Sequence, residues 1–279
     1  MSLKFTTNLR NDRSAYLSTD LVTLQHKDVI KTWLGEKVEF VYDNTRNRGL
    51  NLYYGTRAKL FFEAFDQLDA KKANLFIVGL DIRHYKKIHR DLIWASRIAA
   101  STSFGTRKLI YYLGSVDNWI NLSTKTQTFD QSVLIDQTQN YVYQAIATNM
   151  RGFTQNIRNG NSFAVINNEL RWPIVKYFMN RPIHSDFFEN FQVITFFDIG
   201  TAWSGSSPNS DQNAYNKEII QNGPITIIID KDRQPIVYGY GFGLRSRLLG
   251  YFVRADWAWG IENNTVLPSI FYLSLSLDF

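Results

Sequence analysis

The stretch Phe-Tyr-Leu-Ser-Leu-Ser-Leu-Asp-Phe at residues 271–279 decides the fold class. Apolar residues fill every odd position and Ser or Asp fill most even ones, which is the two-residue period of a β-strand with unlike faces. The same alternation recurs around 56–64, 73–86 and 250–262, where one face is apolar and the other carries charged residues. Helical periodicity is almost absent, so the sequence predicts an all-β protein.

The composition of the apolar faces separates two kinds of barrel. In a soluble barrel the apolar face fills the core, whereas in a membrane barrel it meets lipid and carries aromatic girdles. Phe, Tyr and Trp are frequent on these faces and make up 15% of the chain. No apolar run reaches the roughly 18–20 residues that a membrane helix needs. The pattern favours an antiparallel transmembrane β-barrel, with a soluble binding barrel as the alternative.

Composition and spacing argue against chemistry at a metal or nucleophile. Cysteine is absent, which excludes disulfides and thiolate metal sites and fits an oxidising envelope compartment. The net charge of +6 is dispersed without a basic helix, so nucleic acid is not an expected partner. The histidines lack metal-ligand spacing, and no Ser/His/Asp order suggests a nucleophile. We expect no enzyme activity, no catalytic residue, no metal and no cofactor.

Connection lengths suggest the orientation of the barrel. Short connections alternate with long polar ones, as periplasmic turns alternate with extracellular loops. The connection 173–188 departs from this rule, because it is long where a short turn is expected. One or two weaker strands are expected within 3–26, and the convincing strands are expected near 36–44, 55–66, 73–86, 90–103, 107–114, 160–172, 189–203, 235–247, 250–262 and 268–279.

Several motifs in a fixed order carry a family resemblance. Met150-Arg151-Gly152-Phe153 resembles the (Val/Ile/Leu)-Arg-Gly-(Phe/Tyr) loop signature of the BamA/TamA superfamily of outer-membrane assembly barrels, also called the bacterial surface antigen family. The segment 168–173, which contains Glu169, is similar to the family's next strand. Phe196-Phe197-Asp198-Ile199-Gly200 resembles its Phe-x-Asp-x-Gly strand. The resemblance covers roughly residues 36–279 and ends on a terminal aromatic strand.

The resemblance implies a sixteen-stranded barrel, of which ten to twelve strands are visible here. We expect residues 1–279 to be a single C-terminal barrel domain, a fragment of a longer protein. The family's signature loop folds into the lumen and pairs its Arg with acidic groups of the wall. Carried over, Arg151 would bind Glu169 and Asp198, with Gly152, Phe153 and Gly200 in the same site. The alternative is an Arg151 on an exposed loop tip.

Two further segments bear on this site and on assembly. Gly239, Gly241 and Gly243 share one face of a strand, and their small size is expected to let the inward loop approach the wall. The terminal aromatic strand resembles the signal by which outer-membrane barrels are themselves inserted, although any lipid-facing last strand would look alike. The residues of that signal are Phe271, Leu273, Leu275, Leu277 and Phe279.

The resemblance also implies a function and a location. The chain is expected to be integral to the bacterial outer membrane and to assist insertion or translocation of other polypeptides. Its expected partners are membrane lipid and lipopolysaccharide, unfolded client polypeptides, and periplasmic POTRA repeats or lipoprotein subunits. A membrane anchor or exporter for a fused N-terminal domain and a passive pore remain alternatives. The last strand lacks the glycine that such insertases often carry, which keeps the anchor alternative open.

Overall fold

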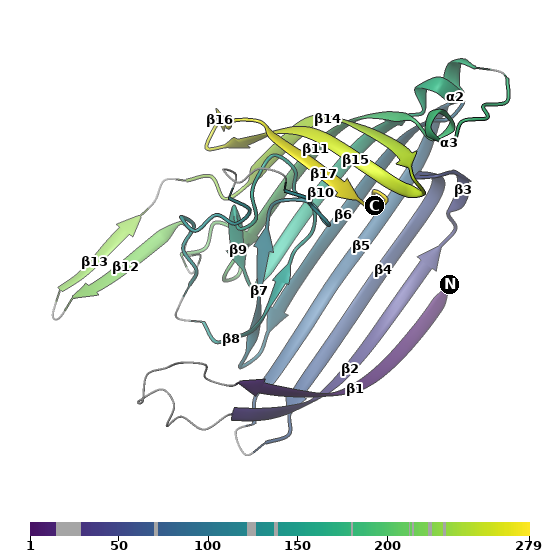
Figure 1. Cartoon of the computed structure of the whole chain (residues 1–279). Coiled ribbons are helices and arrows are strands. Elements are labelled where there is room, and N and C mark those ends of the chain that lie inside the picture. Colours follow the sequence, from purple (N-terminus) through teal and green to yellow (C-terminus); the bar gives the residue numbers. More distant parts are fainter. Residues whose placement is uncertain are drawn as a thin grey trace, which may run out of the picture.

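A computed structural model of the chain shows a large antiparallel sheet rolled into a barrel wall (Figure 1). It describes residues 1–14, 29–69, 72–121, 127–136, 139–179, 181–211, 213, 215–222, 225–230 and 233–279. Twelve strands belong to the sheet, and neighbouring wall strands pair antiparallel. The all-β fold class predicted from the alternation is therefore confirmed.

The wall strands follow one another around the sheet almost in chain order. They are β1 (Ser2–Ser14), β2 (Val29–Asp43), β4 (Leu52–Gln67), β5 (Asn74–His89), β6 (Leu92–Phe104), β10 (Ser162–Trp172), β11 (Gln192–Trp203), β14 (Val237–Leu248), β15 (Tyr251–Glu262) and β17 (Ile270–Leu275). The short strands β3 (Arg46–Gly49) and β16 (Thr265–Val266) pair with β4 and β15.

The remaining elements lie in the connections. A three-stranded sheet contains β8 (Tyr141–Ile146), β7 (Lys108–Leu113) and β9 (Arg158–Gly160), and a hairpin contains β12 (Lys217–Asn222) and β13 (Ile225–Asp230). Two short helices, α2 (Ile174–Phe178) and α3 (Asp186–Glu189), occupy the connection between β10 and β11. Among the described residues, no helix combines the length and the apolar character needed to cross a membrane.

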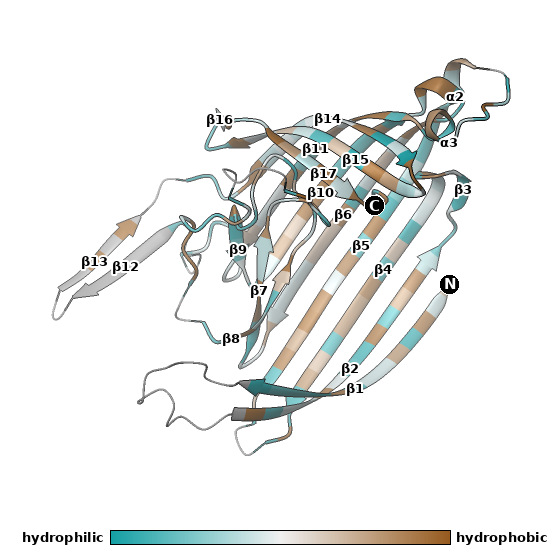
Figure 2. Cartoon of the chain, viewed as in Figure 1, coloured by the Kyte–Doolittle hydropathy of each residue, from teal (hydrophilic) through white to brown (hydrophobic). Residues whose placement is uncertain are grey.

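The wall has two unlike faces, and hydropathy alternates along its strands (Figure 2). On β11, Phe197 is 42% exposed on the convex face, whereas the adjacent Asp198 is fully buried on the concave face. Aromatic rings stack across strands on the convex face, Phe62 on Phe76 and Phe76 on Phe104. An exposed apolar and aromatic outer face is what a barrel in lipid requires.

The chain between β6 and β10 folds into the concave side of the wall (Figure 1). Its side chains Leu113, Met150 and Phe153 pack against Val165 of β10 and Val237 of β14 in one hydrophobic cluster. The interior of the wall is therefore partly filled by an apolar core. A porin-like channel would instead have a polar, water-filled interior.

One predicted wall strand lies elsewhere in the structure, and another is described only in part. The segment 107–114 does form a strand, β7, but it pairs with β8 and β9 inside the wall. Residues 109–113 are all buried, so β7 lacks the charged face of a wall strand and belongs in the core. In 3–26, β1 covers the beginning, and residues 15–26 lie outside the described part.

The last strand is shorter than the predicted 268–279. It ends at Leu275, and the chain then turns into the concave side, where Phe279 packs in a cluster with Tyr85 and Ile93. Phe279 therefore does not share the convex face with Phe271, Leu275 and the other residues of the predicted insertion signal. The five residues of the predicted signal therefore do not all face outward: the last one that does is Leu277, which is 42% exposed.

The outer edge of β17 is also covered in part. The backbone nitrogen of Ile120 donates to the carbonyl of Leu273 at 2.7 Å, and Trp119 bridges to Ser274. An uncovered edge strand presents unpaired backbone groups that recruit other strands. The inner segment thus protects part of this edge.

Candidate functional site

The site is built on the concave face of β10 and β11. Asn167 lies directly opposite Asp198 in the register of these strands, and Glu169 lies opposite Phe196. Because side chains two apart in a strand share a face, Glu169 and Asp198 point to the same side of the wall. Both carboxylates are buried, at 2% and 0% exposure, so they need cationic or hydrogen-bonding partners.

Arg151 supplies the main cation. It belongs to the chain between β6 and β10 that folds into the concave side of the wall, which we call the inner segment. Its Nε lies 2.7 Å from Asp198 Oδ2, and its Nη2 lies 2.8 Å from Oδ1, a bidentate pair. Its Nη1 donates to Glu169 Oε1 at 2.6 Å. The guanidinium also stacks over the ring of Phe196, with Cζ 3.8 Å from the ring centre. One planar fork therefore joins two neighbouring strands, a geometry that Lys could not reproduce.

Arg151, Glu169 and Asp198 form what we call the Arg151 cluster. Arg171 extends this cluster toward the C-terminal tail. Arg171 Nε donates to the other carboxylate oxygen of Glu169 at 2.9 Å. Its Nη2 donates to the carbonyl of Phe279 at 2.8 Å, and its Nη1 donates to the carbonyl of Asn51 at 3.0 Å. A buried chain of contacts thus leads from the inner loop to the C-terminal tail.

The tail is held by its own acidic residue. Asp278 accepts from Arg245 Nε at 3.0 Å and lies 3.4 Å from Arg254 Nε. Asn51 Nδ2 donates to it at 2.8 Å, and Arg245 is further paired with Asp256 at 2.7 Å. We call Arg245, Arg254, Asp256 and Asp278 the tail cluster. It ties the C-terminal tail to the inside of the wall.

Small residues let the loop come close to the wall. A Cβ at Gly152 would lie 2.6 Å from the nitrogen of Gly260, and Gly152 also has a φ of +93°, which favours glycine. A Cβ at Gly239 would lie 2.0 Å from the carbonyl oxygen of Arg151. A Cβ at Gly200 would lie 3.0 Å from Met150 Sδ. Larger residues at these positions would push the loop off the wall.

The glycine triplet behaves only partly as expected. Gly239 faces the inner loop, as described above. A Cβ at Gly241 would instead meet the carbonyl oxygen of Trp257 at 2.1 Å, and one at Gly243 would meet Asp256 Oδ1 at 2.0 Å. These two glycines make room for β15 and for the tail cluster rather than for the loop.

A tyrosine of the last strand fixes the loop backbone. The nitrogen of Gly152 donates to the Tyr272 hydroxyl at 3.1 Å, and that hydroxyl donates to the carbonyl of Phe153 at 2.7 Å. Tyr272 is fully buried and Phe153 is 1% exposed in the hydrophobic cluster. The loop is therefore bonded to β10, β11 and β17 at once.

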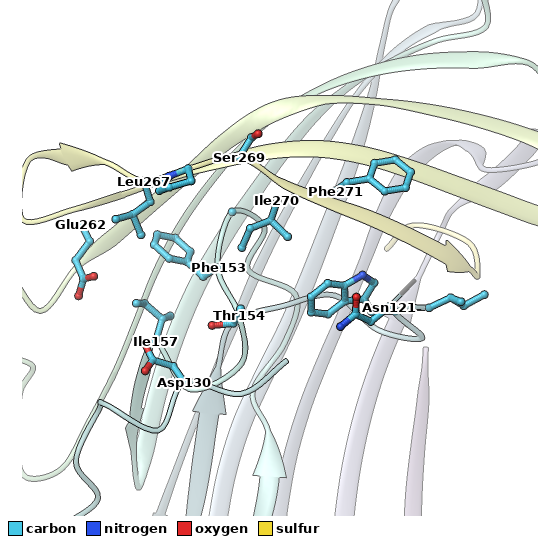
Figure 3. A pocket seen from close by; sticks show the side chains of 14 residues that line it. Asn121, Asp130, Phe153, Thr154, Ile157, Glu262, Leu267, Ser269, Ile270 and Phe271 are labelled. Carbon is cyan, nitrogen blue, oxygen red and sulfur yellow. The ribbon is translucent and has the colours of Figure 1, made fainter. Parts of the chain in front are cut away.

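A cavity of about 830 Å³ lies between the loop and the last strand. Phe153, Thr154 and Ile157 line it from the loop, and Leu267 and Ile270 line it from the chain around β16 and β17 (Figure 3). Polar residues, Asp130 and Glu262 among them, also line this cavity, and its presence means that the loop and this strand are not packed together along their whole length.

The structure brings together Arg151, Gly152, Phe153, Glu169, Asp198 and Gly200. Sequence reasoning did not assign Arg171, Tyr272 or the tail cluster to this site. Arg171 could have been found, because it shares the inward face with Glu169 two residues away. The pairing of Asn51 with Asp278 has no signal in the sequence, because these residues are 227 positions apart.

Comparison with known proteins agrees with this architecture. No curated protein sequence matches the chain significantly. The family model of the Omp85 superfamily domain, however, matches residues 37–279, which is most of the chain and includes every residue of the site. The chain therefore belongs to the Omp85 superfamily.

Proposed function

We propose that this chain is an outer-membrane barrel that assists insertion or translocation of other polypeptides. We also propose that the loop around Arg151, the Arg151 loop, holds the segment between β6 and β10 in one position inside the lumen. The superfamily supports the coarse assignment to an insertion or translocation barrel of the bacterial outer membrane. The bidentate bond of Arg151 to Asp198, inside a buried cluster, carries the finer proposal. In this proposal the loop acts by position and needs no covalent chemistry.

The passive pore is the weaker alternative. The inner segment places Leu113, Met150 and Phe153 in an apolar core with the wall. Steady conduction through a barrel requires a polar, hydrated lumen. A lumen filled in this way favours a barrel that opens for a client over one that stands open.

The partners proposed for this role follow from its chemistry. They are unfolded polypeptides in the periplasm, lipid and lipopolysaccharide around the wall, and POTRA repeats or lipoprotein subunits that would deliver clients. A dedicated exporter or anchor is the second candidate. It is favoured by the tail cluster, which holds the end of the last strand inside the wall through Asp278 and so opposes easy opening there.

The test replaces the native protein in cells by Arg151→Ala and Arg151→Lys, followed by quantitative proteomics of the outer membrane. We expect both variants to fold and to lose function, because Lys cannot bridge two carboxylates with a planar fork. Loss of many unrelated barrels supports a general insertase, and loss of one surface protein supports an exporter. Lys37→Gln, on the same inner face but outside the loop contacts, is the control. Normal proteomes in both Arg151 variants would refute the role of the loop.

A further inference from the structure

The connection between β10 and β11 departs from its surroundings. The neighbouring connections at this end of the wall, 90–91 and 249–250, are tight turns, whereas the connection from 173 to 191, described except for residue 180, contains the two short helices α2 and α3. Short connections lie on the periplasmic side of outer-membrane barrels. We call residues 173–191 the elbow; it joins the two strands that carry Glu169 and Asp198.

The first half of the elbow is held against the end of β10. Arg171 points inward and is fully buried, so the next residue, Trp172, points outward. The ring of Trp172 contacts the rings of Tyr177 and Phe178 at centroid distances of 5.7 and 5.8 Å. Arg90 of the neighbouring turn donates to the carbonyl of Tyr177 at 2.8 Å. The helix α2 is thus fixed to the end of β10 and to the turn between β5 and β6.

The second half is fixed in the same way. Arg245 of β14 points inward, and the following Ser246 points outward and donates to the carbonyl of Phe187 at 2.7 Å. Arg247 lies 3.4 Å from Asp186 of α3. The two helices therefore lie at the end of the wall, beyond the ends of β10 and β11 (Figure 2).

The elbow and the adjoining turns expose large apolar side chains. Phe178 is 64% exposed and Phe188 is 52% exposed, although each lies in a helix that is held on the wall. Contiguous exposed apolar patches mark interaction surfaces. We define the apolar collar as the eight exposed residues Ile88, Phe178, Met179, Phe187, Phe188, Leu248, Leu249 and Tyr251.

We propose that the apolar collar is a membrane-surface site, in which the elbow lies in the headgroup layer of the leaflet at the short-turn end of the barrel. Two observations select lipid as the occupant. The collar lies at the end of the convex apolar face, and exposed cations lie beside it, Lys86 and Lys87 at the end of β5 and Arg90 in the following turn. Aromatic and aliphatic side chains beside Lys and Arg are the composition of interfacial segments that bind anionic lipid.

This contact would brace the candidate site from outside. The elbow follows directly on β10 and precedes β11, and the carboxylates of Glu169 and Asp198 hold Arg151 between these strands. A membrane-anchored elbow therefore limits how far the two strands can separate. The proposal rests on the position of the elbow and stands whether the barrel inserts, exports or anchors.

The absence of cysteine allows a direct test. The full chain is prepared as Phe178→Cys, Phe188→Cys or Leu249→Cys, labelled with the environment-sensitive fluorophore NBD and refolded into vesicles of phosphatidylcholine and phosphatidylglycerol. Leu249 is 91% exposed, so its replacement leaves the packing intact even if the phenylalanine variants fold poorly. The exposed Ser207, in the long connection after β11, gives the control Ser207→Cys. Heat-modifiability on gels verifies folding of each variant.

We expect NBD emission at the three collar positions to shift to shorter wavelength relative to position 207, and to be quenched by lipids brominated near the headgroup. Omitting phosphatidylglycerol should reduce the quenching, because the cations lose their counter-charge. Emission equal to that of the control, without bromolipid quenching, would overturn the proposal. Self-quenching that rises with protein density and ignores bromolipid would also overturn it, and would identify the collar as a contact between copies.

Discussion

Two parts of the inner face differ in how their charges are used. On β2 and β4, Lys37 lies 2.7 Å from Glu63, with side chains 29% and 18% exposed. Between the loop and β10, Arg151 lies 2.6 Å from Glu169, with side chains 4% and 1% exposed. The distances are nearly equal, and the difference is the loop that covers the second pair. Where the loop covers the wall, a carboxylate that would otherwise face the lumen, Glu169, becomes part of a buried contact.

The energetic consequences of covering are unequal. Partly exposed ion pairs contribute about 0–1 kcal/mol, because water screens them and the side chains lose entropy. A buried pair gains little over an apolar replacement, yet removing one partner costs about 3–5 kcal/mol, because the other charge stays buried. The Arg151 cluster is therefore better understood as a device for fixing one loop position than as a source of net stability.

The largest effect is expected for Asp198→Ala. The change leaves the Arg151 guanidinium without its bidentate partner and should lower the free energy of unfolding by about 3–5 kcal/mol. Guanidinium titration of the barrel in detergent micelles measures this loss. Limited trypsin digestion should also cut at Arg151 in the variant and not in the parent. A loss below 1 kcal/mol with no new cleavage would mean that the loop is held by its apolar contacts alone.

The two parts of the inner face also differ in how far they could be predicted. The alternation of apolar and polar residues in β4, β5 and β15 predicted which side chains share a face, because a two-residue period follows directly from strand geometry. The motifs around Arg151, Glu169 and Asp198 placed those residues on facing elements. The placement of β7 failed because a strand buried on both faces has no period to read, and the turn of Phe279 into the wall depends on Asn51 and Arg171, which are remote in sequence.

The next effect is expected for Asp278→Asn in the tail cluster. The neutral amide keeps the shape but loses the charge-assisted bond from Arg245 and the ion pair with Arg254, which should cost about 1.5–3 kcal/mol. The exposed Asp117→Asn serves as the matched control and should stay near the parent. Hydrogen exchange measured by mass spectrometry should rise in 276–279 in the first variant. Unchanged exchange there would mean that Phe279 alone holds the tail.

A smaller effect is expected for Gly239→Ala, which tests the close approach of the loop. The new Cβ would lie 2.0 Å from the carbonyl oxygen of Arg151, so loop or strand must shift. Overpacking of this kind costs about 1–3 kcal/mol. Gly49→Ala is the control, because its nearest neighbour would be 3.6 Å away. Equal midpoints of denaturant unfolding for the two variants would show that the loop can retreat without loss.

The smallest effect is expected for Glu63→Gln on the uncovered part of the inner face. Lys37 keeps a second partner there, Glu39 at 3.3 Å, and water reaches both side chains. The change in unfolding free energy should stay within about 1 kcal/mol, and it should shrink further at high salt, because exposed pairs are screened. Glu169→Gln is the matched change under the loop and should cost several times more. If the two substitutions cost the same, covering by the loop would not be what distinguishes the Arg151 cluster, and the distinction between the two parts of the inner face would have to rest on the number of bonds instead.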